Sequence, residues 1–575
     1  MNDNKNMVLA MVLIAIVLFG GSALSERFFP AAGPRTVKVE DGKVKPLPQP
    51  NVSPAGAASP AALRARDTVL GETPRVTIQT PSLAGSIDLK GARFDDLVLV
   101  RQREGLAKDS PPVRLLSPGG APNAYFAGFG WTGEGVAVPD ANTVWTASST
   151  TLTPATPVTL SWTNPTGQTF QLIVSVDEGY LFTVKQRVAN AGSGAVAVRP
   201  YGLASRAKKS ADPTSWTMHV GPISFLGGKA SYDTDWETLD EDRAGVTRDS
   251  RGGWLGFTDK YWLTALVPAG DAPIAASFRK SESGAYQADY AGAPVVVAPG
   301  QAVTGETRLF AGAKEKTWLD RYETAGITKL SKSIDWGWFE WFMRPIFSLL
   351  QWLFHATGNF GVAIICLTFI VRLIMFPIAD RQFRSMAGMR RVQPKMKAIQ
   401  ERHKDDKPKL QQEMLKLYQE EKINPAAGCL PILLQIPVFY ALYKVLMVSV
   451  EMRHQPFALW IKDLSAPDPL TPVNLFGLLD FTPPALLAIG VLPILLGVTM
   501  WMQFKLNPAQ LDPVQQQVFG IMPWVMMVIM APFAAGLQLY WVVSNILTIA
   551  QQKWLYHRYD MEAGTVILDA KPIKK

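Results

Sequence analysis

The residue with the clearest chemical potential is an arginine inside an apolar run. Arg372 lies in the otherwise uncharged stretch from Ile364 to Pro377, and no acidic residue is near it in sequence. An Arg at the centre of a membrane helix costs about 2.5–3.5 kcal/mol on insertion scales. Asp380 follows eight residues later, which places Arg372 about 12 Å inside the end of a helical span. Two interpretations stay open: a side chain that reaches back to the membrane surface, and a positive charge that faces a wet cavity.

Further polar residues, a proline and two aromatics occur in the same apolar part of the chain. Thr368 precedes Arg372 by four residues and therefore lies on the same helix face. The other members of this set are Gln435, Pro437, Gln538, Tyr540, Trp541, Ser544 and Asn545. Taken singly, each polar residue is explained by a hydrogen bond between helices, and the proline by packing geometry. Together with Arg372 they indicate a hydrophilic cavity wall, beside which the two aromatics could contact an apolar chain.

Motifs for catalysis or nucleotide use are absent from the sequence. There is no GxxxxGK[ST] phosphate loop, no HExxH zinc motif and no GxSxG nucleophile elbow. The five His are scattered, and no acidic pair lies within an apolar run, as a proton relay would need. The sequence therefore predicts no enzyme, no metal site and no cofactor.

The elements that position these residues begin with apolar runs. The 575-residue chain is 48% hydrophobic with two Cys, which excludes general disorder and a disulfide scaffold. The run from Met7 to Leu24 is about 27 Å long as a helix, enough to cross a bilayer. It is an uncleaved anchor or a cleaved signal peptide. Five further runs occupy 346–379, 430–450, 484–504, 517–534 and 535–552. Six transmembrane helices are therefore predicted.

Basic residues predict how these spans are oriented. The stretch 381–424 carries twelve Lys and Arg against six acidic residues, whereas 451–483 carries only Arg453 and Lys462. The positive-inside rule places 381–424 in the cytoplasm and 451–483 outside it. Six spans then put both termini in the cytoplasm and the large domain between the first two spans in the periplasm.

Two segments beside the spans have helical periodicity. In 381–424 apolar residues recur at three and four positions, with a turn at Asp405–Pro408. This pattern predicts an antiparallel helical hairpin with a basic surface, either a solvated loop or a docking arm for an acidic partner. Residues 334–344 are dense in aromatics, which predicts an amphipathic helix in the outer membrane interface.

Residues 67–328 are typical of β structure. Thr169–Val176 and Tyr180–Val188 alternate with a period of two around Asp177–Gly179, which predicts a hairpin. Other short strands are expected at 75–80, 97–101, 144–151, 262–267 and 295–297. Many short strands with little helix predict an all-β sandwich. The predicted domains are an anchor at 1–29, a Pro/Ala-rich linker at 30–66, the sandwich at 67–328, a polytopic α-helical core at 329–557 and a tail at 558–575.

The core resembles the YidC/Oxa/Alb family of membrane protein insertases, in its Gram-negative form with a large periplasmic domain. The resemblance rests on short motifs whose order and spacing match over about 331–557. These motifs are Thr368–Arg372, Met386–Arg390, Gln393–Lys395, Glu413–Tyr418, Asn424–Pro425, Gly428–Pro431, Gln435–Phe439, Pro456–Leu464, Gly497–Met500 and Tyr540–Asn545. No single motif is specific, but jointly they are.

The resemblance implies an insertase and chaperone of the bacterial inner membrane. It implies that Arg372 faces a groove open to cytoplasm and lipid, and that Thr368, Gln435, Tyr540 and Trp541 match groove positions. The implied substrates are nascent membrane proteins, and the implied partners are the Sec translocon, the ribosome, the signal recognition pathway and the lipid bilayer. No nucleotide and no sequence-specific nucleic acid is implied. The stretch 471–484 is longer than the resemblance implies for that loop.

Two alternatives from other classes stay open. An anion transporter or channel would use Arg372 as a binding charge, but it predicts inverted repeats, which we do not find in the sequence. A sugar-binding module anchored by the spans would need a carbohydrate cleft. Trp254, Tyr261 and Trp262 are better explained as core residues of the sandwich than as the walls of such a cleft.

Overall fold

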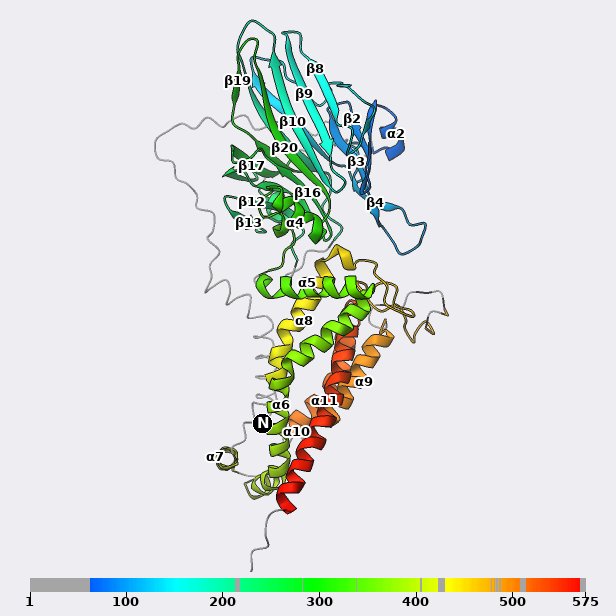
Figure 1. Cartoon of the computed structure of the whole chain (residues 1–575), viewed down its shortest axis with the longest axis vertical. Helices are drawn as coiled ribbons and strands as arrows, with labels where there is room; N and C mark the ends of the chain where they lie inside the picture. The colour runs from blue at the N-terminus through cyan, green and yellow to red at the C-terminus, as the bar shows by residue number, and fades with distance from the viewer. Residues whose placement is uncertain are drawn as a thin grey trace, which may run out of the picture. The chain divides into compact units, whose positions relative to one another are not determined.

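The computed structural model describes residues 63–568, except for gaps at 213–217, 243, 282, 338, 404–405, 422–429, 477, 480, 482–483, 485–487 and 507–512. The predicted anchor at 1–29 and almost all of the linker at 30–66 lie outside the described residues. In chain order, the described part is a β domain followed by a set of helices (Figure 1).

The β domain consists of two sheets. The strands are β1 (Arg75–Gln79), β2 (Leu83–Asp88), β3 (Arg93–Arg103), β4 (Pro112–Leu116), β5 (Tyr125–Glu134), β6 (Thr146–Ala147), β7 (Thr151–Leu152), β8 (Val158–Thr163), β9 (Gln168–Val176), β10 (Leu181–Asn190), β11 (Val196–Arg206), β12 (Gly221–Leu226), β13 (Lys229–Ser231), β14 (Val246–Arg251), β15 (Trp254–Thr258), β16 (Trp262–Val267), β17 (Pro273–Lys280), β18 (Tyr286–Ala291), β19 (Val295–Val297) and β20 (Ala302–Ala313). The first sheet has the order β14-β17-β18-β11-β5-β3-β2-β1-β7, with β19 beside β11 and β4 beside β3. The second has the order β13-β12-β15-β16-β20-β10-β9-β8-β6. Short helices α2 (Arg66–Leu70), α3 (Trp236–Glu241) and α4 (Lys316–Thr324) lie at the start, middle and end of this part of the chain.

The two sheets pack face to face, which confirms the predicted sandwich. Phe94 on β3 contacts Phe182 on β10, with ring centroids 5.3 Å apart. Trp131 on β5 meets Phe170 on β9 at 5.2 Å. The predicted hairpin is antiparallel β9–β10, and residues alternate between buried and half-buried along β9. One face of each strand therefore fills the core.

One predicted strand, 144–151, is wrong as a continuous element. The structure divides it into β6, which pairs with β8 in the second sheet, and β7, which pairs with β1 in the first. The chain crosses from one sheet to the other between these two short strands. Local alternation cannot reveal such a crossing, because both pieces keep extended backbone.

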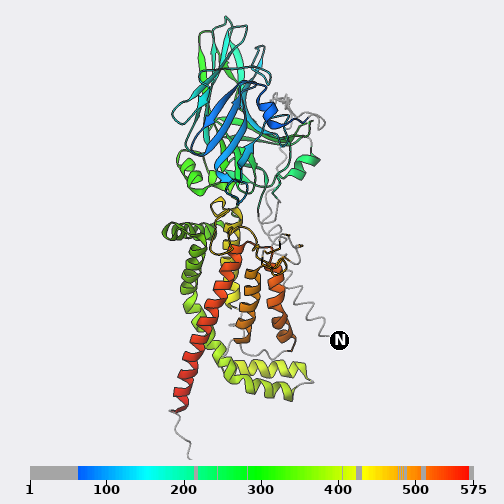
Figure 2. The ribbon, with the colours of Figure 1, turned by 90° about the vertical axis from the view of Figure 1, so that its right-hand side faces the viewer.

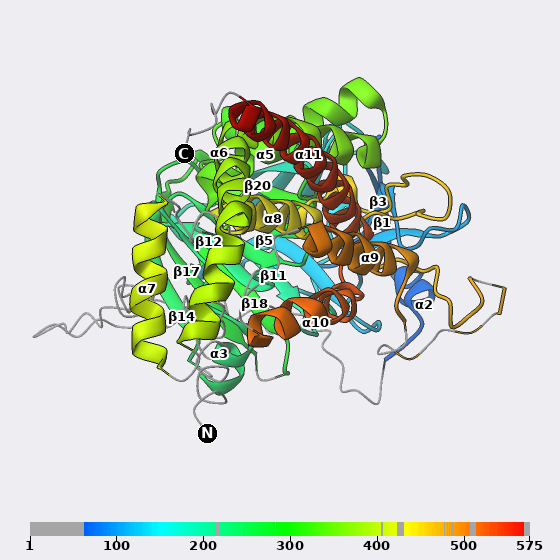
Figure 3. The ribbon, with the colours of Figure 1, turned by 90° about the horizontal axis from the view of Figure 1, so that it is seen from below.

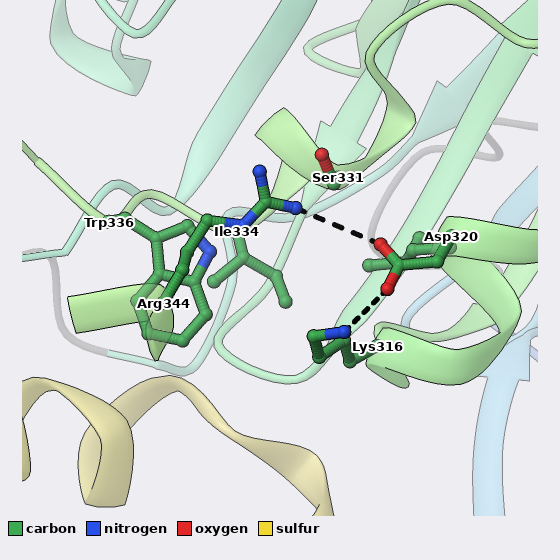
Figure 4. Close-up of a pocket in the computed structure, with 7 residues that line it drawn as sticks. Lys316, Asp320, Ser331, Ile334, Trp336 and Arg344 are labelled. Carbon is green, nitrogen blue, oxygen red and sulfur yellow. Dashed lines mark hydrogen bonds and ion pairs between the residues drawn. The ribbon is translucent and has the colours of Figure 1, made fainter. Parts of the chain in front are cut away.

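The short helix η2 (Leu330–Ser333) leads into the helical part of the chain. In order, the helices that follow are α5 (Glu340–Thr357), α6 (Phe360–Arg402), α7 (Lys407–Glu420), α8 (Leu430–Val448), η4 (Val450–Met452), α9 (Val491–Leu506), α10 (Pro513–Met530) and α11 (Ala535–Leu568). Helix α5 is amphipathic. Its buried residues are Met343, Phe347, Leu350 and Leu353, whereas Trp341 and Trp352 are exposed. A small pocket near its start includes Asp320, which is 2.6 Å from the Lys316 ammonium and 3.7 Å from the Arg344 guanidinium (Figure 4).

The predicted boundaries at α5 and α6 need correction. The amphipathic helix was expected at 334–344 and a continuous span at 346–379, but α5 continues to Thr357 and α6 begins only at Phe360. Gly358 ends α5 in a left-handed conformation, with φ 71°. The Asn359 side chain then caps α6 by accepting a hydrogen bond from Val362 N–H at 3.1 Å. A Gly followed by Asn is a helix stop and start, and it separates two apolar segments that a hydropathy window merges.

Helix α6 continues without a break through Pro377 and Pro394 to Arg402. Helix α7 lies beside its last turns (Figures 2 and 3). The two helices share a small apolar core of Val392, Met396 and Leu417. A cytoplasmic position for this helical pair stays a prediction.

Among the described residues, one helix, Phe360–Asp380, is long and apolar enough to cross a membrane. Three shorter apolar helices occupy Gln435–Val448, Val491–Leu506 and Gly520–Met530. The count of six transmembrane helices is therefore not confirmed and stays a prediction. Helix α11 also runs to Leu568, well beyond the predicted end of the last span at 552.

Candidate functional site

Three helices carry the residues that the sequence singled out. Thr368 and Arg372 are on α6, Gln435 and Pro437 are on α8, and Tyr540, Trp541, Ser544 and Asn545 are on α11. Helix α11 contacts both α6 and α8. The apolar character of each segment favours a helix, but only the packing of the helices brings polar residues from different segments together.

Arg372 makes its contacts with α11. Its Nη2 donates to the backbone carbonyl of Ser544 at 3.2 Å and to the Ser544 hydroxyl. In the part of the chain that the structure describes, no carboxylate pairs with Arg372. Its neighbours Leu373 and Ile374 are 75% and 71% exposed. Arg372 therefore lies at the border between the packed and the outward faces of α6, with its charge not neutralised by an acid.

A second polar contact joins α11 to α8. Gln435 Nε2 donates to the hydroxyl oxygen of Tyr540. Tyr540 and Ser544 are four residues apart, so they lie on one face of α11. Gln435, Tyr540, Ser544 and Arg372 thus form a line of polar groups across three helices, which we call the polar path. Three of its members were predicted to share a cavity wall, and Tyr540 was predicted to lie beside it.

The remaining predicted residues lie around this path in different ways. Trp541 packs edge-on against Phe439 of α8, with ring centroids 4.9 Å apart. The Thr368 hydroxyl donates to the Ile364 carbonyl of its own helix at 2.7 Å, and Thr368 is buried. Pro437 is half-buried within α8, two residues from Gln435.

Asn545 and Gln538 have local structural partners. Asn545 Nδ2 donates to the Thr499 hydroxyl of α9 at 3.1 Å, so this side chain joins α11 to a helix outside the polar path. Gln538 Nε2 donates to the carbonyls of Met530 and Phe533, both at 2.8 Å. Gln538 therefore satisfies the turn between α10 and α11. The expectation that it belongs to a cavity wall has no support in these contacts.

Sequence reasoning missed Lys444, a second basic residue in an apolar helix. It lies on α8, is 1% exposed and has its ammonium 3.7 Å from the Asp335 carboxylate. The sequence contains the signal for this residue, because a Lys inside the apolar run 430–450 is as unusual as Arg372 in its own run. The partner of Lys444 could not be predicted from the sequence, since Asp335 is more than a hundred residues away along the chain.

The fold defines a protein with a β sandwich and a set of apolar helices. One of these helices carries an arginine that no carboxylate among the described residues neutralises, and this architecture suits a membrane. Residues 75–349 match the family described as YidC periplasmic domain, and residues 352–562 match the family described as 60Kd inner membrane protein. A membrane protein insertase YidC of Zymomonas mobilis is 48% identical over 561 residues, which cover 97% of this chain and 96% of that protein. One of Methylorubrum extorquens is 44% identical, with 97% and 96% covered. The chain belongs to the YidC family of membrane protein insertases.

A solved structure of an active YidC insertase also aligns with the chain. It covers 83% of this chain and 92% of the other, at 18% identity and a TM-score of 0.37. The sequence relatives alone establish that this is an insertase family of the inner membrane with a periplasmic domain, and not an enzyme family. They favour the insertase over the anion transporter and over the anchored sugar-binding module.

Proposed function

We propose that this insertase receives nascent membrane proteins at the polar path, with Arg372 as the charged member of a groove between α6, α8 and α11. One observation carries the proposal: Arg372 is bonded to the neutral Ser544, and among the described residues no acid pairs with it. Lys444 supplies the contrast, since its charge is balanced by Asp335. A cation held by a hydroxyl and a carbonyl keeps its full charge, and that charge is then available to an entering chain.

The path also suits the apolar part of a substrate. Trp541 borders it, and Phe369 and Leu373, which flank Arg372 on α6, are exposed. An entering chain would place its polar or acidic end near Arg372 and its apolar segment along these side chains. Burial of about 20 apolar residues in lipid then drives release. The membrane potential adds about 2.3 kcal/mol per 100 mV for each acidic charge moved outward.

The topology and partners belong to the same proposal. We infer six transmembrane helices, with the N-terminal anchor among them, and both termini in the cytoplasm. The β domain then lies in the periplasm, where the Sec translocon is the expected partner. The basic pair of α6 and α7 would lie in the cytoplasm, where its charge favours an acidic partner such as the ribosome or lipid headgroups. The positive-inside pattern of 381–424 supports this orientation.

The test is site-specific photo-crosslinking to a stalled nascent membrane protein. Probes are placed at Thr368, Gln435 and Tyr540, one on each helix of the proposed groove. Ile521 on α10 serves as a matched control, because it is apolar, 52% exposed and outside the polar path. We expect crosslinks from the three groove positions to exceed those from Ile521. Equal yields from all four positions would contradict the groove.

A further inference from the structure

The connection between α8 and α9 contains a segment with its apolar side chains outside and its polar side chains inside. We call the described residues of 471–481 the apolar loop. Leu478, Phe476 and Leu475 are 84%, 55% and 53% exposed. Thr471 and Asn474 are only 3% and 8% exposed. This is the reverse of the arrangement that water favours.

The apolar loop is held in this shape by its own polar groups. Phe476 N–H donates to the Thr471 carbonyl at 2.8 Å, and Leu479 N–H donates to the Asn474 carbonyl at 3.1 Å. The Thr471 hydroxyl donates to Asn474 Oδ1 at 2.9 Å. Leu475 and Phe476 have φ values of 49° and 57°, a conformation that costs an L-residue roughly 1–2 kcal/mol. In this conformation the hydrogen-bonded polar groups lie inside the loop, and the bulky apolar side chains point outward.

The base of the loop is fastened to the first turn of α9. Asp468 Oδ2 accepts a hydrogen bond from Leu492 N–H at 2.7 Å, and Asp468 Oδ1 accepts one from Trp460 Nε1 at 2.9 Å. Val491 N–H donates to the Leu470 carbonyl at 3.1 Å. An acid at a helix N-terminus is also favoured by the helix dipole. The apolar loop is therefore anchored beside α9 (Figure 1).

The surface that continues from the loop is apolar as well. On α9, Leu495, Val498 and Met502 are 40%, 37% and 43% exposed. No Lys or Arg occurs between Lys462 and Lys505, so this stretch offers nothing to an acidic protein or a nucleic acid. No charged residue of either sign occurs in 469–479, and Asp480 follows this uncharged stretch. An uncharged apolar surface that joins the outward face of a membrane helix matches the hydrocarbon of a bilayer.

We propose that the apolar loop inserts into the bilayer leaflet next to the α8–α9 connection and anchors that end of α9 in lipid. The lipid bilayer is a general partner of the family, but this loop is an additional contact that the groove does not require. The proposal holds for either orientation of the spans. A result that refutes insertion of the apolar loop would therefore leave the proposed groove untouched. A result that refutes the groove would likewise leave the proposed insertion of the apolar loop untouched.

The test uses the full-length protein with Leu478→Cys, after replacement of Cys366 and Cys429 by Ser. The new thiol is labelled with an environment-sensitive fluorophore, and the purified protein is reconstituted alone into vesicles of neutral and anionic phospholipid. We expect blue-shifted emission that is quenched by lipids with a doxyl group near the headgroup and protected from aqueous iodide. The matched control is Val296→Cys in β19, which is 66% exposed in the β domain and should show the opposite pattern.

Iodide quenching at Leu478 equal to that at Val296 would overturn the proposal. So would a probe that is water-exposed in vesicles and becomes shielded only when a second protein is added, because the occupant would then be protein. If the Leu478 variant does not fold, Phe481→Cys, at a side chain that is 47% exposed, reads the same loop.

Discussion

Arg372 and Lys444 are two basic side chains in apolar helices with opposite surroundings. The Lys444 ammonium is buried near Asp335, whereas the Arg372 guanidinium is bonded to Ser544 and lies next to exposed apolar residues. Removal of one partner of a buried pair of a cation and an acid leaves an uncompensated charge. A cation without an acid keeps its attraction for an acidic group that arrives later.

At the residue scale, Arg372→Ala should impair insertion of single-span substrates that have an acidic translocated end. A charge pair at 4 Å is worth between about 1 and 4 kcal/mol at effective dielectric constants from 80 to 20, which corresponds to a loss of roughly fivefold or more. The measurement is membrane insertion in cells depleted of the wild-type protein, with a substrate whose acids are replaced by Asn and Gln as the neutral reference.

Arg372→Lys is the matched variant, because it keeps the charge and loses the planar fork. It should insert the acidic substrate better than Arg372→Ala. Ser544→Ala removes one neutral partner of the arginine and should have a smaller effect than loss of the charge. Equal insertion of the acidic substrate by Arg372→Ala and the parent protein would refute a role for the charge.

The junction of α5 and α6 shows how an element boundary sets the site. Asn359 is both the N-cap of α6 and a donor from Nδ2 to the Phe457 carbonyl at 2.8 Å. It therefore starts the helix that carries Arg372 and ties that start to the chain after α8. Gly358 allows the sharp separation of the two helices, because it takes the left-handed conformation without a Cβ clash.

At the element scale, Asn359→Ala should lower the free energy of unfolding by about 1 kcal/mol, the usual worth of an N-cap. Asn359→Ser keeps a capping hydroxyl but loses the reach to Phe457, so it should fall between the parent and the Ala variant. Thermal unfolding of the full-length protein in detergent measures the order. An Ala variant as stable as the parent would show that this cap contributes nothing.

For the molecule as a whole, the β domain contains a buried charge that links stability to pH. Lys314 follows β20 and donates to the Thr258 hydroxyl at 2.9 Å and to the Asp259 carbonyl at 2.8 Å. Burial lowers the pKa of Lys314 from 10.5 to about 8. The folded state thus prefers the neutral amine, while the unfolded chain keeps its proton up to a higher pH. Stability from this group is lost as pH falls through about 8 and increases as pH rises from there towards 10.5.

Across that interval the contribution of Lys314 to the free energy of unfolding should change by at most about 3 kcal/mol. Lys314→Met should therefore show a flatter dependence of melting temperature on pH between about 8 and 10 than the parent protein. Lys185→Met is the control, because Lys185 is an exposed lysine of β10. A parent and a Lys314→Met variant with parallel pH profiles would exclude the buried lysine as their cause.

Local sequence determined much of the molecule. Alternation at 169–188 predicted the β9–β10 hairpin, and the short strands predicted a sandwich, because one buried face per strand leaves a period of two. The sequence also singled out Arg372, since a charged residue within an apolar segment is recognisable without knowledge of its contacts. The order of motifs in the core predicted the family to which the relatives assign the chain.

Only the tertiary structure decided which residues meet. The contact of Arg372 with Ser544 and that of Lys444 with Asp335 each join segments more than a hundred residues apart. Composition treats the two cations alike, whereas packing places an acid beside Lys444 and, within the part of the chain that the structure describes, none beside Arg372. Packing likewise splits 144–151 between two sheets and assigns Gln538 to its own turn. In the apolar loop, hydrogen bonds at Thr471 and Asn474 keep the polar groups inside, and the apolar side chains are therefore exposed. Residue types determine what a side chain can do, and long-range contacts determine whether it is already satisfied.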